Sequence, residues 1–238
     1  MSDLRAGSVV FLLDVDNTLL DNDRFSDDLR QCLEREVSAA ACTRYWALFE
    51  QSREELGYAD YLGALQRYRL EAPRDLRLAA VSAFMLDYPF ADRLYPEVIP
   101  LLDRLRTWGP TVILSDGDVV FQPRKIQRSG LARVVDDALI YLHKERELDD
   151  VARRHPAERY VLVDDKLSLL TAVKQVWGDR VTTVFPRQGH YARDPAVLAT
   201  CPPADVAVER IGDLLDYDRS ALLARAPTGA ASGPGRGR

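Results

Sequence analysis

Short apolar runs alternate with helix-like patterns along the chain. The runs, rich in β-branched and aromatic residues, lie at residues 9–13, 111–114, 138–142, 160–163, 181–185 and, more weakly, 206–208. Runs of this length predict buried strands that are covered on both faces. Helical patterns separate them at residues 96–108, 123–129, 145–155 and 167–177. The alternation predicts an α/β fold, a Rossmann-like parallel sheet of about five to six strands with right-handed crossovers.

One segment breaks this alternation. Residues 24–86 contain no convincing strand, but show helical patterns at 27–37, 43–56, 61–68 and 74–85, punctuated by Gly57 and Pro73. A loop of that length without its own structure would be unusual. We therefore expect residues 23–87 to form an all-helical subdomain, inserted after the first strand into a core of residues 1–22 and 88–225. Residues 226–238, mostly Gly, Ala, Pro and Arg, predict a disordered tail.

The composition is that of an ordinary globular protein. Of the 238 residues, 47% are hydrophobic and 29% charged, and the formal net charge is -5. The negative charge disfavours general binding to nucleic acids or anionic membranes, which requires a basic surface. The three cysteines form no metal-binding or disulfide pattern, and neither a signal peptide nor a membrane-spanning stretch is recognisable. We expect a cytoplasmic protein that binds neither nucleic acid nor membrane.

Polar residues follow the predicted strands at the points where the strands end. They are Asp14 and Asp16 after the first strand, Ser115, Asp116 and Gly117 after the second, His143 and Lys144 after the third, and Asp164 and Asp165 after the fourth. Ligands bind at the carboxyl ends of parallel strands, and clustered carboxylates repel one another unless a cation neutralises them. Carboxylate oxygens without a His or Cys set favour Mg²⁺, a cofactor suited to phosphoryl transfer.

Each residue also has a simpler interpretation. Asp164 and Asp165 could cap the helix that follows them, Asp16 and Ser115 could be turn residues, and Lys144 could be a solvated lysine. Their location at one edge of one predicted sheet favours a shared site. An NAD-binding Rossmann protein is disfavoured because no GxGxxG sequence follows the first strand.

The order of these motifs resembles the haloacid dehalogenase superfamily. The DxDxT motif formed by residues 14–18, then Ser115, then a lysine, and finally the pair Asp164 and Asp165 match that family over about residues 8–215. The helical insertion stands where the family carries a C1-type cap.

The resemblance implies a role for each residue. Asp14 would be the nucleophile that forms an aspartyl-phosphate, and Asp16 the general acid and then the general base. Ser115, Asp116, Gly117 and Lys144 would bind the phosphoryl group, with Lys144 also holding Asp14. Mg²⁺ would bind Asp14, Asp164, Asp165 and the backbone carbonyl of Asp16.

The lysine motif departs from the family pattern because Glu145, not proline, follows Lys144. Lys125 is a rival, but it lies inside a predicted helix, so we favour Lys144. Lys166 is interpreted as a surface residue of the next helix. Residues 187–191 are placed to reach the edge of the site, and the insertion offers as substrate contacts Arg24, Arg44, Tyr45, Trp46, Arg53, Tyr58 and Tyr61.

Together these features predict a Mg²⁺-dependent phosphatase that acts on a small phosphorylated metabolite. Asp16 argues against cleavage of a carbon–halogen bond, because a halide leaves without a proton. A phosphomutase with the same residues and a non-catalytic phosphate-binding or regulatory protein stay open as alternatives. The sequence does not indicate which metabolite is the substrate.

Overall fold

A parallel sheet forms the centre of the protein in the computed structural model, which describes residues 8–223. The strands are β1 (Val9–Leu13), β2 (Thr111–Asp116), β3 (Asp137–Tyr141), β4 (Arg159–Val163), β5 (Val181–Pro186) and β6 (Val206–Val208). They pair in the order β3-β2-β1-β4-β5-β6, all parallel. The predicted Rossmann-like α/β fold is confirmed. The predicted tail, residues 226–238, lies outside the described residues.

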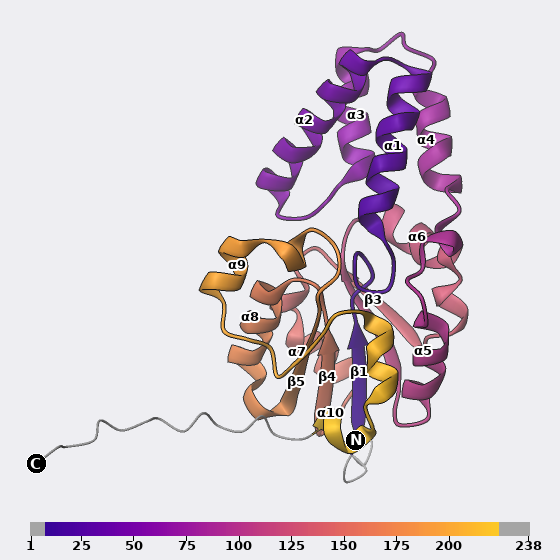
Figure 1. Ribbon diagram of the computed structural model, residues 1–238. Coiled ribbons are helices and arrows are strands. Elements are labelled where there is room, and N and C mark those ends of the chain that lie inside the picture. The colour runs from indigo at the N-terminus through magenta and orange to yellow at the C-terminus, as the bar shows by residue number, and fades with distance from the viewer. Residues whose placement is uncertain (1–7, 224–238) are drawn as a thin grey trace, which may run out of the picture.

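Helices cover both faces of this sheet (Figure 1). In the core they are α5 (Val98–Arg106), α6 (Phe121–Ser129), α7 (Leu148–Arg154), α8 (Leu167–Trp177), α9 (Pro195–Thr200) and α10 (Arg219–Leu223). Successive side chains of a strand point to opposite faces. Phe11 of β1 therefore joins the apolar cluster that contains Leu101 of α5, whereas Leu12 joins the cluster that contains Val151 of α7 and Leu170 of α8.

The strand order reverses at β1, which lies between β2 and β4. Leu13 is level with both Ile113 and Val163, and the backbone N–H of Asp14 donates to the carbonyl of Val163 at 3.0 Å. Such a reversal opens a crevice at the carboxyl ends of the strands. The ends of β1, β2 and β4 therefore meet at one place.

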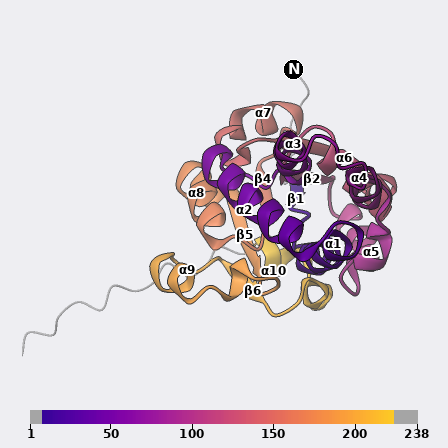
Figure 2. The same ribbon diagram turned by 90° about the horizontal axis from the view of Figure 1, so that it is seen from above.

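Four helices between β1 and β2 form the cap. They are α1 (Asn22–Glu36), α2 (Ala39–Leu56), α3 (Tyr61–Glu71) and α4 (Leu78–Asp87). The cap stands above the carboxyl ends of the strands, and α2 and α3 lie over them when the molecule is seen from above (Figures 1 and 2). Two chain segments connect it to the core, and they pair with each other through a bridge between Leu20 and Leu94.

The first two cap helices begin earlier than the apolar pattern predicted. The side chain of Asp21 accepts a hydrogen bond from the backbone of Arg24, so α1 begins at Asn22. Ser38 likewise caps α2 by accepting from Ala41. Capping satisfies backbone donors that would otherwise lack a partner, so a polar residue before each helix, and not the apolar periodicity, marks where the helix begins.

Two core segments also differ from expectation. The strand predicted to be buried on both faces at residues 138–142 is the edge strand β3, in which Asp137 and Ala138 are exposed. The helix predicted from residue 145 begins only at Leu148, because Lys144–Arg146 form a 3₁₀ turn. At the start of that turn, the backbone N–H of Lys144 donates to Asp116 Oδ1 at 2.8 Å.

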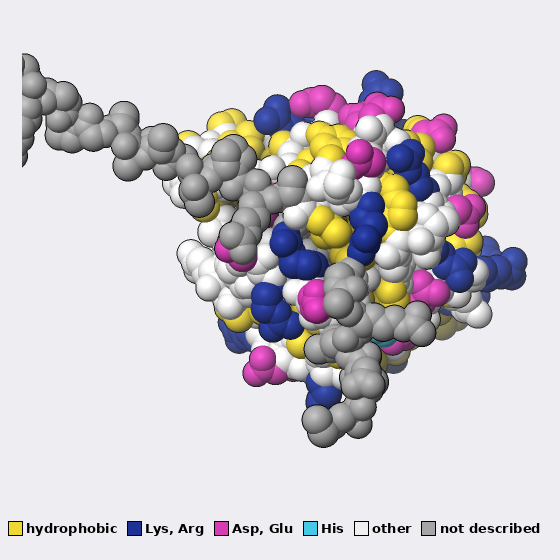
Figure 3. All heavy atoms as spheres, turned by 90° about the horizontal axis from the view of Figure 1, so that it is seen from below, with side chains coloured by type: hydrophobic (Ala, Val, Ile, Leu, Met, Phe, Trp, Pro, Cys, Tyr) yellow, Lys and Arg dark blue, Asp and Glu magenta, His cyan; other side chains and the backbone are white. Residues whose placement is uncertain are grey.

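The face opposite the cap carries basic, acidic and hydrophobic side chains that are interspersed where they are visible (Figure 3). Within residues 8–223, no helix combines the length and apolar character needed to cross a bilayer. The cysteines Cys32, Cys42 and Cys201 are free thiols.

Phe25 of α1 joins the cap to the core. Its fully buried ring lies 5.2 Å from the ring of Tyr61 in the cap, and 5.1 Å and 5.5 Å from the rings of Phe90 and Phe121 outside it. We predict that Phe25→Ala lowers the free energy of unfolding by about 3–5 kcal/mol, because truncation removes a buried ring and leaves a cavity. Urea denaturation followed by circular dichroism measures this change.

Leu70→Ala provides the control, because Leu70 belongs to the same cap but is 76% exposed. It should shift the denaturation midpoint only slightly. Equal shifts for the two variants would show that the junction between cap and core contributes little to stability.

Candidate active site

Lys144 lies between Asp14, the predicted nucleophile, and Asp164, a predicted metal ligand. Asp14 follows β1 directly and is 6% exposed, and Lys144 is 1% exposed. The Nζ atom of Lys144 donates to Asp14 Oδ1 at 2.6 Å and to the carbonyl of Leu114 at 3.1 Å. It also lies 2.6 Å from Asp164 Oδ2. Lys144 thus contacts Asp14 and Asp164 from the end of β3, and its role in binding a phosphoryl group stays a prediction.

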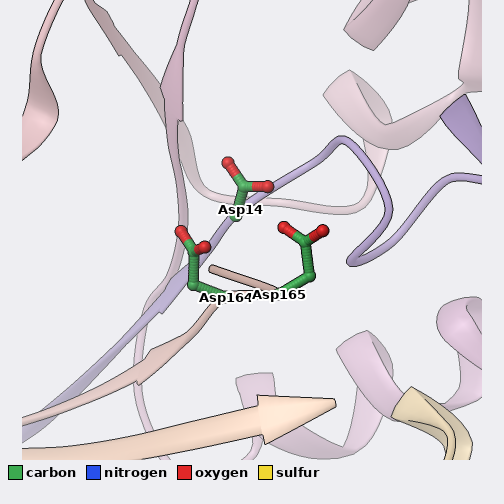
Figure 4. Close-up of side chains that lie close together, drawn as sticks. All are labelled: Asp14, Asp164 and Asp165. Atoms are coloured by element: carbon green, nitrogen blue, oxygen red, sulfur yellow. The ribbon is translucent and has the colours of Figure 1, made fainter. Parts of the chain in front are cut away.

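Three carboxylates converge beside this lysine. Oxygen atoms of Asp14, Asp164 and Asp165 lie within 4.8 Å of one another, and all three residues are buried. Their side chains project from the ends of β1 and β4 into one space (Figure 4). Neither side-chain oxygen of Asp165 has a hydrogen-bond partner among the described residues. Buried, unpartnered carboxylate oxygens fit a hard divalent cation such as Mg²⁺.

The electrostatics of the cluster follow from burial and like charge. Burial, and then the neighbouring charges of Asp164 and Asp14, raise the pKa of Asp165 well above its usual range. Burial also raises the pKa of Asp164 to about 6, although Lys144 opposes the rise. Burial alone would lower the pKa of Lys144, but Asp14, Asp164 and Asp116 together raise it. A cation at this place would favour the ionised carboxylates.

The last two residues of β2 supply a hydroxyl and support Lys144. Ser115 is 1% exposed, and its Oγ accepts a hydrogen bond from Gln122 Nε2 at 2.9 Å. Asp116 uses Oδ1 to accept from the backbone of Lys144, so its carboxylate positions the lysine loop. Gly117 adopts a φ of 157° and donates its N–H to the carbonyl of Tyr141 at 3.0 Å. Whether Ser115, Asp116 and Gly117 contact a substrate stays a prediction.

Asp16 lies apart from the three clustered carboxylates. Both of its side-chain oxygens accept hydrogen bonds from Lys125 Nζ, at 2.7 and 2.8 Å. The two candidate lysines therefore hold different acids, Lys144 holding Asp14 and Lys125 holding Asp16. The metal-binding role expected of the Asp16 backbone carbonyl stays a prediction.

The turn after β1 is fixed by its own polar residues. Asn17 has a left-handed φ of 58°, which asparagine tolerates better than most residues. Its Oδ1 accepts the N–H groups of Asn22 and Asp23 and so anchors the start of α1. Thr18 Oγ1 accepts the N–H of Asp165 at 3.1 Å. The motif of residues 14–18 therefore connects the site to the cap and to the end of β4.

A cavity of about 650 Å³ lies between cap and core, beside Asp16. Four of the predicted cap contacts line it: Trp46, Arg53, Tyr58 and Tyr61. The other three do not belong to it. Tyr45 is fully buried and donates its hydroxyl to the carbonyl of Tyr61, whereas Arg44 pairs with Glu71 and Arg24 with Asp28, each at the cap surface.

The core side of the cavity includes the loop after β5, as predicted for residues 187–191. His190 and Tyr191 line the cavity, and Tyr191 accepts a hydrogen bond from Arg53 of the cap at 2.5 Å. A second cap contact places Gly57, with φ +81°, against the ring of His143. A side chain at Gly57 would meet His143 Cε1 at 2.5 Å unless the imidazole moved, and the left-handed φ itself favours glycine.

The structure differs from the sequence-based prediction at Lys166 and adds Gln122 to the site. Lys166 is half-buried rather than a surface residue, lines the cavity, and lies 5.3 Å from the ring centroid of Tyr191. The helix carrying Gln122 was predicted to begin at residue 123, but α6 begins at Phe121. With that start, Gln122 and Lys125 have the i,i+3 spacing of neighbours on one helix face. This spacing was the sequence feature that could have indicated Gln122 as a residue of the site.

Several solved structures resemble this chain in fold. A haloacid dehalogenase-like hydrolase from Burkholderia xenovorans LB400 is 61% identical, with a TM-score of 0.87 over 91% of this chain and 99% of that chain. The magnesium-bound HAD-hydrolase YfnB of Bacillus subtilis is 15% identical, with a TM-score of 0.58 over 88% and 97%. The L-2-haloacid dehalogenase of Xanthobacter autotrophicus is 17% identical, with a TM-score of 0.58 over 87% and 96%. No family model and no curated protein sequence matches the chain.

The raised pKa of Asp165 predicts a pH-dependent difference between the wild type and Asp165→Asn in EDTA. Below about pH 3 the carboxyl group is largely protonated in both the folded and unfolded states, so the two proteins should be similarly stable. As the pH rises through the higher folded-state pKa, burial of the charge destabilises the folded wild type. At neutral pH Asp165→Asn should therefore be more stable than the wild type.

Thermal denaturation across this pH range measures the difference, and the comparison is then repeated with Mg²⁺. The cation should stabilise the wild type and reduce or reverse the advantage of Asp165→Asn. A difference that is constant with pH and insensitive to Mg²⁺ would contradict the electrostatic interpretation of the cluster.

Proposed function

Because this chain belongs to the haloacid dehalogenase superfamily of hydrolases, we propose that it is a Mg²⁺-dependent phosphatase of a small phosphorylated metabolite. The proposal rests on one observation: two acids follow β1, and each of them is bound by a different lysine. Asp14 is held by Lys144 beside the carboxylate cluster, and Asp16 lines the cavity under the cap.

In the first half-reaction, a carboxylate oxygen of Asp14 attacks the phosphorus of the substrate and the bond to the leaving oxygen breaks. Asp16 donates the proton that the departing alkoxide needs, so an alcohol and an aspartyl-phosphate result. Lys144 keeps Asp14 oriented through its 2.6 Å hydrogen bond. The hydroxyl of Ser115, oriented by Gln122, is available to the transferring phosphoryl group.

In the second half-reaction, water attacks the phosphorus of the aspartyl-phosphate. Asp16, now a carboxylate, takes the proton from that water, and the bond between phosphorus and Asp14 breaks. Inorganic phosphate leaves, and both aspartates return to their starting forms. The cap shields this step from bulk solvent, because Arg53 and Gly57 contact the core loops on either side of the cavity.

Asp14, Asp164 and Asp165 would hold the Mg²⁺ ion, whose charge would offset the negative charge of the phosphoryl group. The unpartnered oxygens of Asp165 support this assignment. The substrate would occupy the cavity, where Trp46 and Tyr58 offer apolar surface and Arg53 a positive charge. We propose a small metabolite as partner, with neither nucleic acid nor membrane involved.

A substrate assay separates the candidate reactions. We predict that the purified protein releases phosphate from p-nitrophenyl phosphate and from a panel of metabolite phosphates with Mg²⁺, and that EDTA abolishes release. Chloride release from 2-chloropropionate, without phosphate release from any ester, would instead favour a dehalogenase. Transfer of label between positions of one sugar phosphate would favour a phosphomutase, and inactivity on all of them a non-catalytic phosphate binder.

Asp14→Asn tests the nucleophile directly. Replacing the attacking carboxylate with a near-isosteric amide should lower kcat by at least about 10³-fold and leave the fold intact, because the covalent route is lost. Asp75→Asn is the matched control, since Asp75 pairs with Arg77 in the cap and belongs neither to the carboxylate cluster nor to the cavity beside Asp16. Undiminished turnover by Asp14→Asn would disprove the assignment.

A further inference from the structure

Lys125 is a fully buried lysine whose charge the reaction scheme above does not use. It lies on α6 with 0% of its surface exposed. Its Nζ atom lies 5.3–5.8 Å from the centroids of four aromatic rings, which belong to Phe25, Tyr61, Phe90 and Phe121. The faces of aromatic rings attract a cation at such distances.

All three N–H donors of Lys125 have partners. Two bonds reach the two oxygens of Asp16 at 2.7 and 2.8 Å, and the third reaches Asn22 Oδ1 at 2.9 Å. An ammonium group has only three donors, so none is left for a phosphate oxygen. Lys125 is therefore poorly suited to bind the phosphoryl group and well suited to orient Asp16.

The arrangement leaves Asp16 accessible on its other side. Asp16 is 27% exposed and lines the cavity, whereas Lys125 is enclosed. Each carboxylate oxygen has two lone-pair positions, so the bonds to Lys125 do not prevent contact with a leaving group. Because one nitrogen binds both oxygens, rotation of the carboxylate is restricted. A single hydrogen bond would leave the carboxylate freer to rotate.

Stability alone does not explain a lysine at this place. An ion pair in the protein interior contributes little compared with well-packed apolar side chains, because desolvation opposes the attraction. Four rings around the position would accommodate an unbranched apolar side chain such as methionine.

Lys125 also connects Asp16 to the cap. Asn22, its third partner, is the first residue of α1, and its Nδ2 donates to the hydroxyl of Tyr61 at 3.0 Å. Phe25 and Tyr61 belong to the cap, whereas Phe121 belongs to α6 of the core. The orientation of Asp16 therefore depends on the seating of the cap on α6.

We propose that Lys125 is a positioning residue that holds the Asp16 carboxylate toward the leaving group when the cap is seated. The inference deepens the proposed phosphatase function and rests on it. Asp16 touches the leaving group, and Lys125 acts through Asp16. Loss of Lys125 should therefore impair proton transfer to the leaving group and leave substrate binding largely intact.

The test compares Lys125→Met with the wild type on phosphate esters whose leaving groups differ in basicity, from p-nitrophenyl to simple alkyl phosphates. Asp16 is also the base in the second half-reaction, which is the same for every ester, so the rates are measured for the first half-reaction, in single turnovers. Because general acid catalysis contributes about 10²–10⁴-fold, the rate of leaving-group release from alkyl phosphates should fall by roughly 10²-fold with little change in substrate affinity. On p-nitrophenyl phosphate, whose leaving group needs no proton, the fall should be below about 10-fold. An equal loss on all esters would overturn the positioning role.

Two comparisons make this result specific. Lys125→Met combined with Asp16→Asn should be no slower than Asp16→Asn alone, because both changes remove the same function. Lys174→Met is the matched control, since Lys174 pairs with Asp205 at 2.7 Å on α8, outside the active site. It should leave the dependence on the leaving group unchanged. Should Lys125→Met not fold, Lys125→Gln, which retains donors, replaces it.

A crystal structure of the variant decides the question independently of activity. In Lys125→Met the Asp16 carboxylate should rotate away from its wild-type position or become disordered, with α6 unmoved. An unchanged Asp16 would overturn the inference. If the wild type hydrolyses no phosphate ester, the proposed function fails, and this structural comparison still tests Lys125.

Discussion

Mutual repulsion among carboxylates gathered at the end of a buried sheet is the constraint on which the rest of the structure depends. Asp14, Asp164 and Asp165 lie within 4.8 Å of one another with almost no exposure to water. Such a cluster is unfavourable unless positive charge compensates it. Lys144 supplies one such charge from the end of β3, and the unpartnered oxygens of Asp165 leave room for a cation to supply more.

A second acid, Asp16, is compensated separately. Its lysine comes from α6 and is enclosed by rings of both cap and core. The two lysines therefore divide the site into a part where the phosphoryl group would be transferred, around Asp14, and a part where the leaving group would be protonated, around Asp16. Since Asn22 of the cap also binds Lys125, the second part is complete only with the cap seated.

Much of this arrangement could be predicted from the sequence. The apolar strand runs and the acids that follow them indicated the sheet and the meeting of Asp14, Asp164 and Lys144. The starts of α1 and α2 could not be predicted from apolar periodicity, because Asp21 and Ser38 determine them through polar caps. The pairing of Asp16 with Lys125, separate from that of Asp14 with Lys144, was not predicted. A sequence does not show whether a lysine inside a helix is buried. Its partners lie about 100 residues away in sequence and meet it only after folding.

Trapping the covalent intermediate tests the central claim, that Asp14 is the nucleophile, most directly. Protein mixed with a hydrolysable phosphate ester and Mg²⁺ would be quenched with borohydride during turnover, which reduces an aspartyl-phosphate to homoserine. We expect homoserine at position 14 in peptide mass spectrometry, present in the wild type and absent from Asp14→Asn. Turnover with an unmodified Asp14, or homoserine at any other aspartate, would contradict it.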